Sequence, residues 1–294
     1  MKRALCVGIN NYPGTGNDLQ GCVNDMMAWR ELLKAQDFQV SLLQDGAATK
    51  GQFLVMLGDL VSKSEPGDQM VVTYSGHGTY VRDINGDEPD SYDEAIYLYD
   101  GALLDDNLRE ELDKIKPGVK AVVVLDSCFS GTATRLVGPM AKYAKPRFMP
   151  PKGASLIMQV KPFLAEADMI ETLLSGCADT EVSYDAYIDN KYTGAFTYWA
   201  IKTFQKGMTY TQWHHAIRAN LPSREYPQTP QLEGSDQNKD SIAFSGGTDD
   251  VPEDPEEPEP PGDAGGSQPS RINWWLILIA FLLVAGYAIW RALT

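Results

Sequence analysis

Short runs of apolar residues alternate with segments of helical periodicity over the first 235 residues of the chain. Apolar runs that turn-forming residues bound on both sides are typical of strands buried on both faces. The strands predicted in this way are Ala4–Ile9, Phe38–Leu43, Gln69–Tyr74, Ala121–Leu125 and Thr172–Ser175, with a last edge segment in Thr229–Gly234. Because helical patterns separate them, we predict an α/β domain with a mostly parallel central sheet.

Apolar residues at helical spacing predict five helices in the same part of the chain. The predicted helices are Asn24–Gln36, Thr49–Ser62, Leu104–Ile115, Ala195–Gln205 and Thr211–Ala219. Thr49 has the side chain that an N-cap needs, and Phe53 and Leu57 follow it on one helix face. Helices between parallel strands cover both faces of the sheet, which gives a three-layer sandwich.

The composition changes at about residue 246. Residues 246–271 are rich in Pro, Glu and Asp and cannot bury enough apolar surface to fold, so we predict a disordered linker after a domain at 1–245. Residues 272–290 contain no charge. About 19 helical residues at ~1.5 Å each span roughly 28 Å, close to the ~30 Å of a bilayer core. We therefore predict a transmembrane helix, with a buried core helix as the alternative.

Charge and cysteine content exclude some classes of function. The net charge is −15, and eight acidic side chains with no basic one lie in residues 249–263. The chain has no basic stripe, so a nucleic-acid partner is excluded. Four cysteines without a Cys-x-x-Cys pair, and three histidines, argue against structural zinc. The first apolar run is too short for a signal peptide, so we expect a tail-anchored, single-pass membrane protein with a cytoplasmic domain.

Two of the predicted strands end in small polar motifs. Gln69–Tyr74 is followed by SGHG, which contains His77, and Ala121–Leu125 is followed by DSCFSG, which contains Cys128. Sites in open parallel sheets form at the carboxyl ends of strands, so both motifs should lie at the same edge. The glycines let the backbone turn sharply and approach a substrate closely.

A histidine next to a cysteine supplies a base and a nucleophile. A free thiol has a pKa of about 8.5 and is mostly protonated at neutral pH. A neighbouring imidazole takes this proton and later returns one to the leaving amine. In isolation Cys128 would be explained as a structural thiol and His77 as a loop histidine. Their occurrence at two strand ends favours a nucleophile–base pair.

The motifs resemble those of one peptidase family. His77 precedes Cys128 by 51 residues, which is similar to the caspase arrangement. SGHG and DSCxSG resemble metacaspases rather than animal caspases, as do VGINNYPGTGNDLQGCVND near the N-terminus, SGCADTEVSYDA (Ser175–Ala186) and GAFT (Gly194–Thr197). The resemblance covers about residues 2–235 and implies a caspase-like α/β sandwich with cysteine endopeptidase activity.

By this resemblance, His77 and Cys128 form the catalytic dyad, and the backbone amides of Gly78 and Cys128 form the oxyanion hole. The chain departs from the family at Phe129, where metacaspases carry His after the nucleophile. Phe129 is not the general base, so activity should survive. The alternative is a catalytically silent caspase-like domain that binds proteins at a membrane, against which the intact dyad argues.

The resemblance also implies an acidic S1 pocket. The matching positions are Asp25 and Asp126, with Cys22 and Ser75 lining the same pocket. A carboxylate pair binds an Arg or Lys side chain through charge-assisted hydrogen bonds, so the substrates should be proteins or peptides with a basic P1 residue. Asp25 alone would also be explained as an acid at a helix N-terminus.

The resemblance implies that calcium could bind as an activator. No cofactor is required for the chemistry itself. The matching acids are Asp93, Asp105 and Asp106, and hard oxygen ligands suit calcium. Arg135 replaces a fourth family Asp and would weaken metal binding. Asp105 and Asp106 would equally be explained as acids that cap a helix.

The segment Leu136–Lys161 is rich in Pro, Lys and Arg, and we interpret it as a long surface loop. It offers Lys142, Lys145, Arg147 and Lys152 in a setting that we expect to be exposed. A peptidase that cuts after basic residues would be able to cleave itself there.

We expect the protein to be a monomer.

Overall fold

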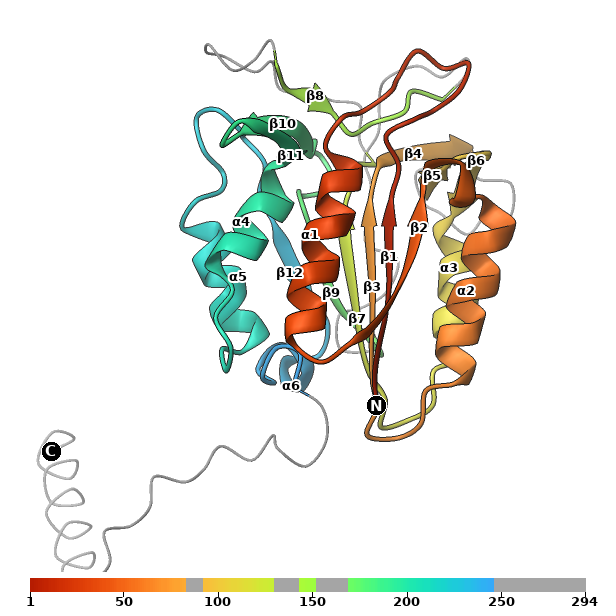
Figure 1. Cartoon of the computed structure of the whole chain (residues 1–294), viewed down its shortest axis with the longest axis vertical. Helices are drawn as coiled ribbons and strands as arrows, with labels where there is room; N and C mark the ends of the chain where they lie inside the picture. The colour runs from red at the N-terminus through yellow and green to blue at the C-terminus, as the bar shows by residue number, and fades with distance from the viewer. Residues whose placement is uncertain (83–91, 130–142, 152–168, 246–294) are drawn as a thin grey trace, which may run out of the picture. The chain divides into compact units, whose positions relative to one another are not determined.

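A six-stranded sheet forms the centre of the protein in a computed structural model that describes residues 1–82, 92–129, 143–151 and 169–245 (Figure 1). The strand order is β12-β9-β7-β3-β1-β2. The strands are β1 (Lys2–Gly8), β2 (Gln39–Gln44), β3 (Gln69–Ser75), β7 (Lys120–Asp126), β9 (Thr172–Ser175) and β12 (Gln231–Glu233). Only β12 runs antiparallel to its neighbour in this sheet, so the predicted mostly parallel sheet is confirmed.

Helices cover both faces of the sheet, as Figure 1 shows. One face carries α1 (Cys22–Ala35), α4 (Ala195–Thr203) and α5 (Tyr210–Arg218), and the other carries α2 (Lys50–Ser62) and α3 (Asp105–Leu112). Alternate strand residues enter two separate cores: Val122 and Val124 pack in one, Val123 and Leu125 in the other. Burial on both faces explains the continuous apolar runs of the central strands.

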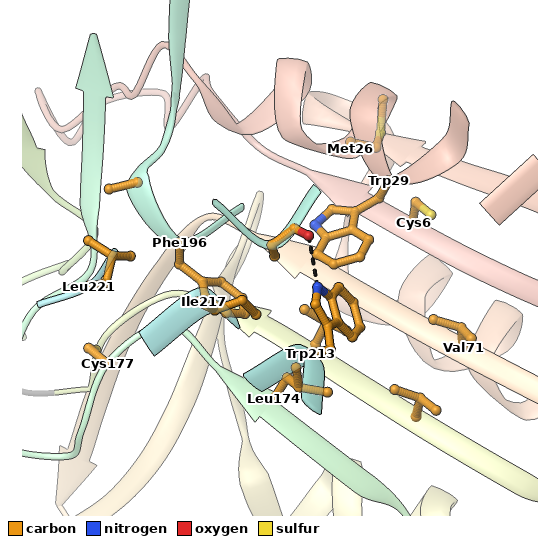
Figure 2. Close-up of a cluster of buried hydrophobic side chains, with 14 of the residues drawn as sticks. Cys6, Met26, Trp29, Val71, Leu174, Cys177, Phe196, Trp213, Ile217 and Leu221 are labelled. Carbon is orange, nitrogen blue, oxygen red and sulfur yellow. Dashed lines mark hydrogen bonds between the residues drawn. The ribbon is translucent and has the colours of Figure 1, made fainter. Parts of the chain in front are cut away.

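Two tryptophans fix the helices on the α1 side of the sheet (Figure 2). The rings of Trp29 in α1 and Trp213 in α5 are buried and meet edge to face, with centroids 6.0 Å apart. The indole Nε1 of Trp213 donates to the carbonyl oxygen of Ala200 in α4 at 2.9 Å, so its polar group is satisfied. This packing joins three helices, two of which begin near the candidate site.

Two small sheets lie at the end of the central sheet to which its parallel strands point (Figure 1). One has the order β4-β5-β6 and the other β11-β10-β8. Their strands are β4 (His77–Arg82), β5 (Tyr92–Leu98), β6 (Gly101–Leu104), β8 (Lys145–Pro146), β10 (Tyr184–Ile188) and β11 (Lys191–Gly194). The short helices are η1 (Asp45–Ala47) and α6 (Asp236–Lys239). The sequence did not predict these two sheets.

The expected domain and anchor are only partly within the described residues. Met1–Pro252 forms one compact unit. Residues 246–294, which include the predicted linker and transmembrane helix, lie outside the described part of the chain. Among the helices that are described, none has the length and apolar character needed to cross a membrane.

Candidate active site

His77 and Cys128 follow two neighbouring parallel strands. Ser75, the last residue of β3, is opposite Asp126, the last residue of β7, so the two strands end level with each other. His77 then starts β4, and Cys128 follows β7 by two residues. The two motifs therefore leave the same edge of the sheet side by side, and both side chains are buried.

Gly78 allows the two motifs to touch. A Cβ at this position would lie 2.2 Å from the carbonyl oxygen of Cys128, which is far inside van der Waals contact. Any side chain here would push the histidine and cysteine segments apart. The glycine after His77 is thus needed for the close approach of the two backbones.

The imidazole of His77 is oriented by a backbone carbonyl. Its Nε2 lies 2.6 Å from the oxygen of Asn17, and because a carbonyl only accepts, Nε2 must carry the hydrogen. Tyr12 packs on the ring with centroids 4.7 Å apart and accepts a hydrogen bond from the His77 amide. Nδ1 is buried with no hydrogen-bond partner among the described residues, and it is the nitrogen left to act as a base.

Burial keeps both members of the pair neutral. It lowers the pKa of His77 to about 4 and raises the pKa of Cys128 to about 12. Both shifts follow from loss of water around the charged form. In this conformation the site holds a thiol and a neutral imidazole.

Two backbone amides converge on one carbonyl oxygen. The N–H groups of Gly78 and Cys128 donate to the oxygen of Arg147 at 2.9 and 3.3 Å. Paired amides beside a nucleophile are the arrangement that stabilises the oxyanion of an acyl-transfer reaction. The carbonyl that they bind here belongs to the protein's own chain.

The side chain of Arg147 enters a pocket of three carboxylates. Its guanidinium lies 2.5 Å from Asp25, 3.0 Å from Asp126 and 3.1 Å from Asp185, and all four side chains are buried. Burial opposes the charge of Arg147, but the carboxylates hold its pKa above the ordinary value. The pocket thus matches the charge and geometry of an arginine side chain.

Residues at the end of β11 and in the first turn of α4 hold two of these carboxylates in place. Asp126 accepts from the amide and hydroxyl of Thr197, in the first turn of α4, at 3.1 and 2.6 Å. Asp25 accepts from the hydroxyl of Thr193 at 2.6 Å and from the amide of Gly194 at 3.0 Å. Burial raises the pKa of Asp25 to about 6, although Arg147 opposes this shift.

Cys22 and Ser75, the other two predicted pocket residues, are both buried. Cys22 is the first residue of α1 and precedes Asp25 by less than one turn. Burial raises the pKa of its thiol, and the nearby charge of Arg147 opposes the shift. Ser75 ends β3 opposite Asp126, and its hydroxyl has no hydrogen-bond partner in the described residues.

The expectation that Arg147 lies on an exposed loop is wrong. Arg147 and Met149 are buried, and Lys145–Pro146 forms β8 against β10. Burial of Arg147 depends on carboxylates that are distant in sequence, so local composition could not reveal it. Lys142 and Lys152 lie outside the described residues.

Sequence reasoning also missed Asp185 as a pocket residue. It lies in β10 and accepts from the amides of Gln20 and Gly21 at 2.7 and 2.9 Å. These bonds join the segment before α1 to β10. The motif SYDA contains Asp185, but nothing in its spacing marked this carboxylate as part of a pocket.

The predicted calcium ligands remain a prediction. Asp105 and Asp106 occupy the first turn of α3, and Asp93 lies in β5, the strand next to β6 that leads into this helix. Within the described residues, no group of three or more His, Cys, Asp or Glu side chains is arranged so that it could hold a metal ion. Arg135, which replaces an Asp of the family's calcium site, lies outside the described residues.

An oriented imidazole, a buried thiol and two converging amides at the edge of an α/β sandwich are the groups that a cysteine peptidase uses. Comparisons agree with this class. The family described as Caspase domain matches residues 1–242. The crystal structure of a protein from Geobacter sulfurreducens has a TM-score of 0.65 at 29% identity and covers 84% of this chain and 100% of its own. That of Caspase-1 from Spodoptera frugiperda has a TM-score of 0.52 at 12% identity, covering 80% and 86%.

Curated relatives give the branch of the family. Metacaspase-1 of Schizosaccharomyces pombe is 31% identical over 79% of this chain, and the match spans 66% of that protein. Metacaspase-1 of Meyerozyma guilliermondii is also 31% identical, over 83% of this chain and 72% of its own length. The chain thus spans about two thirds of the length of these relatives. It belongs to the caspase family, as a metacaspase-like cysteine peptidase.

Proposed function

We propose that this protein is an endopeptidase that cleaves after Arg or Lys by means of the His77–Cys128 dyad. The observation that carries the proposal is the dual position of Arg147. Its guanidinium lies among three carboxylates while its carbonyl oxygen accepts from the amides of Gly78 and Cys128. A residue bound in this way has the features of a P1 residue next to a scissile bond.

The chemistry begins with the thiol of Cys128. Nδ1 of His77 takes its proton, and the sulfur attacks the carbonyl carbon of the P1 residue. The amides of Gly78 and Cys128 stabilise the negative oxygen that develops. The imidazolium then gives its proton to the leaving amine, and water hydrolyses the thioester to release the acid and regenerate the thiol.

Charge sets the P1 preference. Three carboxylates face one guanidinium, so an empty pocket is strongly anionic and attracts a cation. The planar guanidinium of Arg reaches two or three acceptors at once, whereas Lys offers a single ammonium. A P1 Asp would meet like charges at short range and be rejected.

The test compares fluorogenic peptides that differ only in P1. Arg and Lys peptides should be hydrolysed and Asp peptides should not, and Cys128→Ala or His77→Ala should abolish activity. Asp126→Asn or Asp185→Asn should lower kcat/KM on Arg peptides roughly 10- to 100-fold, the equivalent of about 1.5–3 kcal/mol for a hydrogen bond to a charged group.

Asp189→Asn is the matched control, because Asp189 is an exposed carboxylate whose ion-pair partner is Lys202 rather than Arg147. It should leave kcat/KM unchanged. Full activity on Arg peptides in both pocket variants would rule out the acidic S1 assignment.

We also propose that residues 272–290 anchor the protein in a membrane with the peptidase domain in the cytoplasm. The support is the uncharged stretch between Trp274 and Trp290, which follows an acidic, Pro-rich segment. Aromatic residues at both ends of an apolar stretch are typical of membrane interfaces. Such an anchor would restrict cleavage to substrates near that membrane.

A further inference from the structure

The imidazole of His77 forms no hydrogen bond with a carboxylate in the part of the chain that the structure describes. Its Nε2 donates to the carbonyl oxygen of Asn17, and its Nδ1 has no partner there. The charges that act on the ring are those of Lys145 and Arg147, and both disfavour an imidazolium. In serine peptidases a buried carboxylate stabilises this cation. When His77 takes the proton of Cys128, other groups around the ring must therefore stabilise the new charge.

The aromatic ring of Tyr12 lies where it can stabilise an imidazolium. The centroids of the Tyr12 and His77 rings are 4.7 Å apart, and their planes are tilted by 52°. A cation within about 6 Å of an aromatic centroid is attracted by the electron-rich ring, most strongly where water is excluded. Tyr12 is 1% exposed and His77 is 0% exposed, so water does not screen this contact.

Two phenol oxygens also hold the backbone of His77. The Oη of Tyr12 accepts from the His77 amide at 2.8 Å, and the hydroxyl of Tyr74 donates to the His77 carbonyl oxygen at 2.7 Å. A Cβ on Gly76 would lie 2.5 Å from the Oη of Tyr74 and 2.6 Å from that of Tyr12. The glycine before His77 therefore leaves room for both phenols.

One loop supplies both contacts to the imidazole. Tyr12 and Asn17 lie in the loop between β1 and α1, at the edge of the sheet to which β1 points (Figure 1). The carboxylate of Asp18 accepts from the amide of Tyr12 at 2.7 Å. The hydroxyl of Thr15 donates to the carbonyl of Tyr12 at 2.7 Å and accepts from the amide of Asn17 at 3.1 Å. These bonds fix the Tyr12 ring relative to the Asn17 carbonyl.

We propose that Tyr12 is the positioning residue for the general base: its ring holds the imidazole against the Asn17 carbonyl and stabilises the imidazolium during proton transfer. This inference rests on the proposed function, because it takes His77 as the base of that reaction. Within the described residues, Tyr12 forms no hydrogen bond with the three carboxylates of the pocket. A change at Tyr12 should therefore act on kcat and leave KM nearly unchanged.

Two replacements at position 12 separate the charge distribution of the ring from its shape. Tyr12→Phe keeps the ring and removes the hydroxyl. Pentafluorophenylalanine at the same position has nearly the same shape, but its ring face is electron-poor and repels a cation. Relative to Tyr12→Phe, the fluorinated protein should lose roughly tenfold in kcat, which equals about 1.4 kcal/mol. The pKa of His77 should fall by about one pH unit, because the imidazolium is less stable.

The first measurement is the pH dependence of hydrolysis of an Arg-directed fluorogenic peptide. Protonation of His77 removes the base, so the acid limb of kcat/KM should move to lower pH in the fluorinated protein. Burial raises the pKa of the Cys128 thiol and of the Tyr12 and Tyr74 phenols, so these groups do not cause the acid limb. A purely structural defect would lower kcat without moving this limb.

The second measurement needs no peptidase activity. The chain has only three histidines, so ¹⁵N-histidine NMR of Cys128→Ala is simple, and His214→Asn and His215→Asn assign the signals. This spectrum gives the pKa and the tautomer of His77 directly. Contacts between the Tyr12 and His77 rings in nuclear Overhauser spectra of Cys128→Ala test the arrangement without any change at position 12.

Tyr210 is the matched control for the position-12 variants. Its side chain is buried, and its hydroxyl accepts from the backbone amide of Phe244 at 3.1 Å. It also accepts from Gln69, the first residue of β3, whereas His77 follows the last residue of that strand. The same two replacements at Tyr210 should leave kcat and the pKa of His77 unchanged. Thermal unfolding shows whether the two positions affect stability alike.

Equal kcat and equal pKa of His77 in Tyr12→Phe and the fluorinated protein would overturn the inference. So would the absence of contacts between the two rings in the NMR spectra, or an equal loss of kcat from the replacements at Tyr210. If the wild-type protein hydrolyses neither Arg nor Lys peptides, the proposed function fails. The NMR titration still decides whether Tyr12 stabilises the imidazolium, so the two failures are distinguishable.

Discussion

The protonation of His77 links one side chain to the stability of the fold. Burial lowers its pKa from 6.5 to about 4, so between these pH values the unfolded chain binds a proton that the folded chain does not. Stability from the neutral imidazole is therefore complete above pH 6.5 and is lost as the pH falls toward 4. The difference of 6.5 − 4 corresponds to about 3 kcal/mol at most.

We expect wild-type Tm to fall more steeply between pH 6.5 and 4.5 than that of His77→Asn, which has no imidazole to titrate. The exposed His215→Asn serves as the control and should keep the wild-type slope. Differential scanning calorimetry measures Tm. All proteins carry Cys128→Ala, alone or combined with His77→Asn or His215→Asn, so that no self-cleavage occurs during the measurement. Parallel slopes for His77→Asn and its parent would contradict the buried, neutral histidine.

Among the elements, the junction of β11 and α4 positions the acidic pocket. A Cβ on Gly194 would lie 2.0 Å from the Oδ2 of Asp126 and 2.7 Å from the Nη1 of Arg147. Gly194→Ala should therefore displace Asp126 and lower kcat/KM on Arg peptides by roughly tenfold or more, as expected when a charge-assisted hydrogen bond is lost. Hydrolysis of an Arg-directed fluorogenic peptide measures this effect.

The matched glycine is Gly51, in α2, where an added Cβ would meet nothing within 4 Å. Gly51→Ala should keep full activity and raise the stability of α2 by up to about 1 kcal/mol, the helix-propensity difference between the two residues. Equal kcat/KM for the two alanine variants would show that the pocket tolerates the Gly194 methyl.

At the scale of the whole molecule, the apolar stretch 272–290 should decide where the peptidase acts. We expect the full chain to float with liposomes in a density gradient, and a chain ending at residue 245 to stay at the bottom. The shorter chain contains the matched caspase-family region and should keep its peptidase activity. A full chain that stays at the bottom of the gradient in the presence of liposomes, as the shorter chain does, would contradict a membrane anchor.

The sequence by itself determined the layers and the positions of His77 and Cys128. A strand buried on both faces has a continuous apolar run, which can be recognised in the sequence without knowing its partner strands. For this reason β1, β3 and β7 were predictable. His77 and Cys128 directly follow two such strands, and parallel strands end at one edge. The small sheets were not predictable, since short antiparallel strands depend on contacts rather than on periodicity.

Only the tertiary structure decided what fills the pocket. Asp25, Asp126 and Asp185 come from α1, β7 and β10, and Arg147 comes from a segment whose composition is that of a surface loop. A charged side chain becomes buried only when opposite charges and hydrogen bonds compensate the loss of water. Arg147 is 21 positions from Asp126 and 122 positions from Asp25 in the chain. No local sequence pattern could therefore predict that these charges meet.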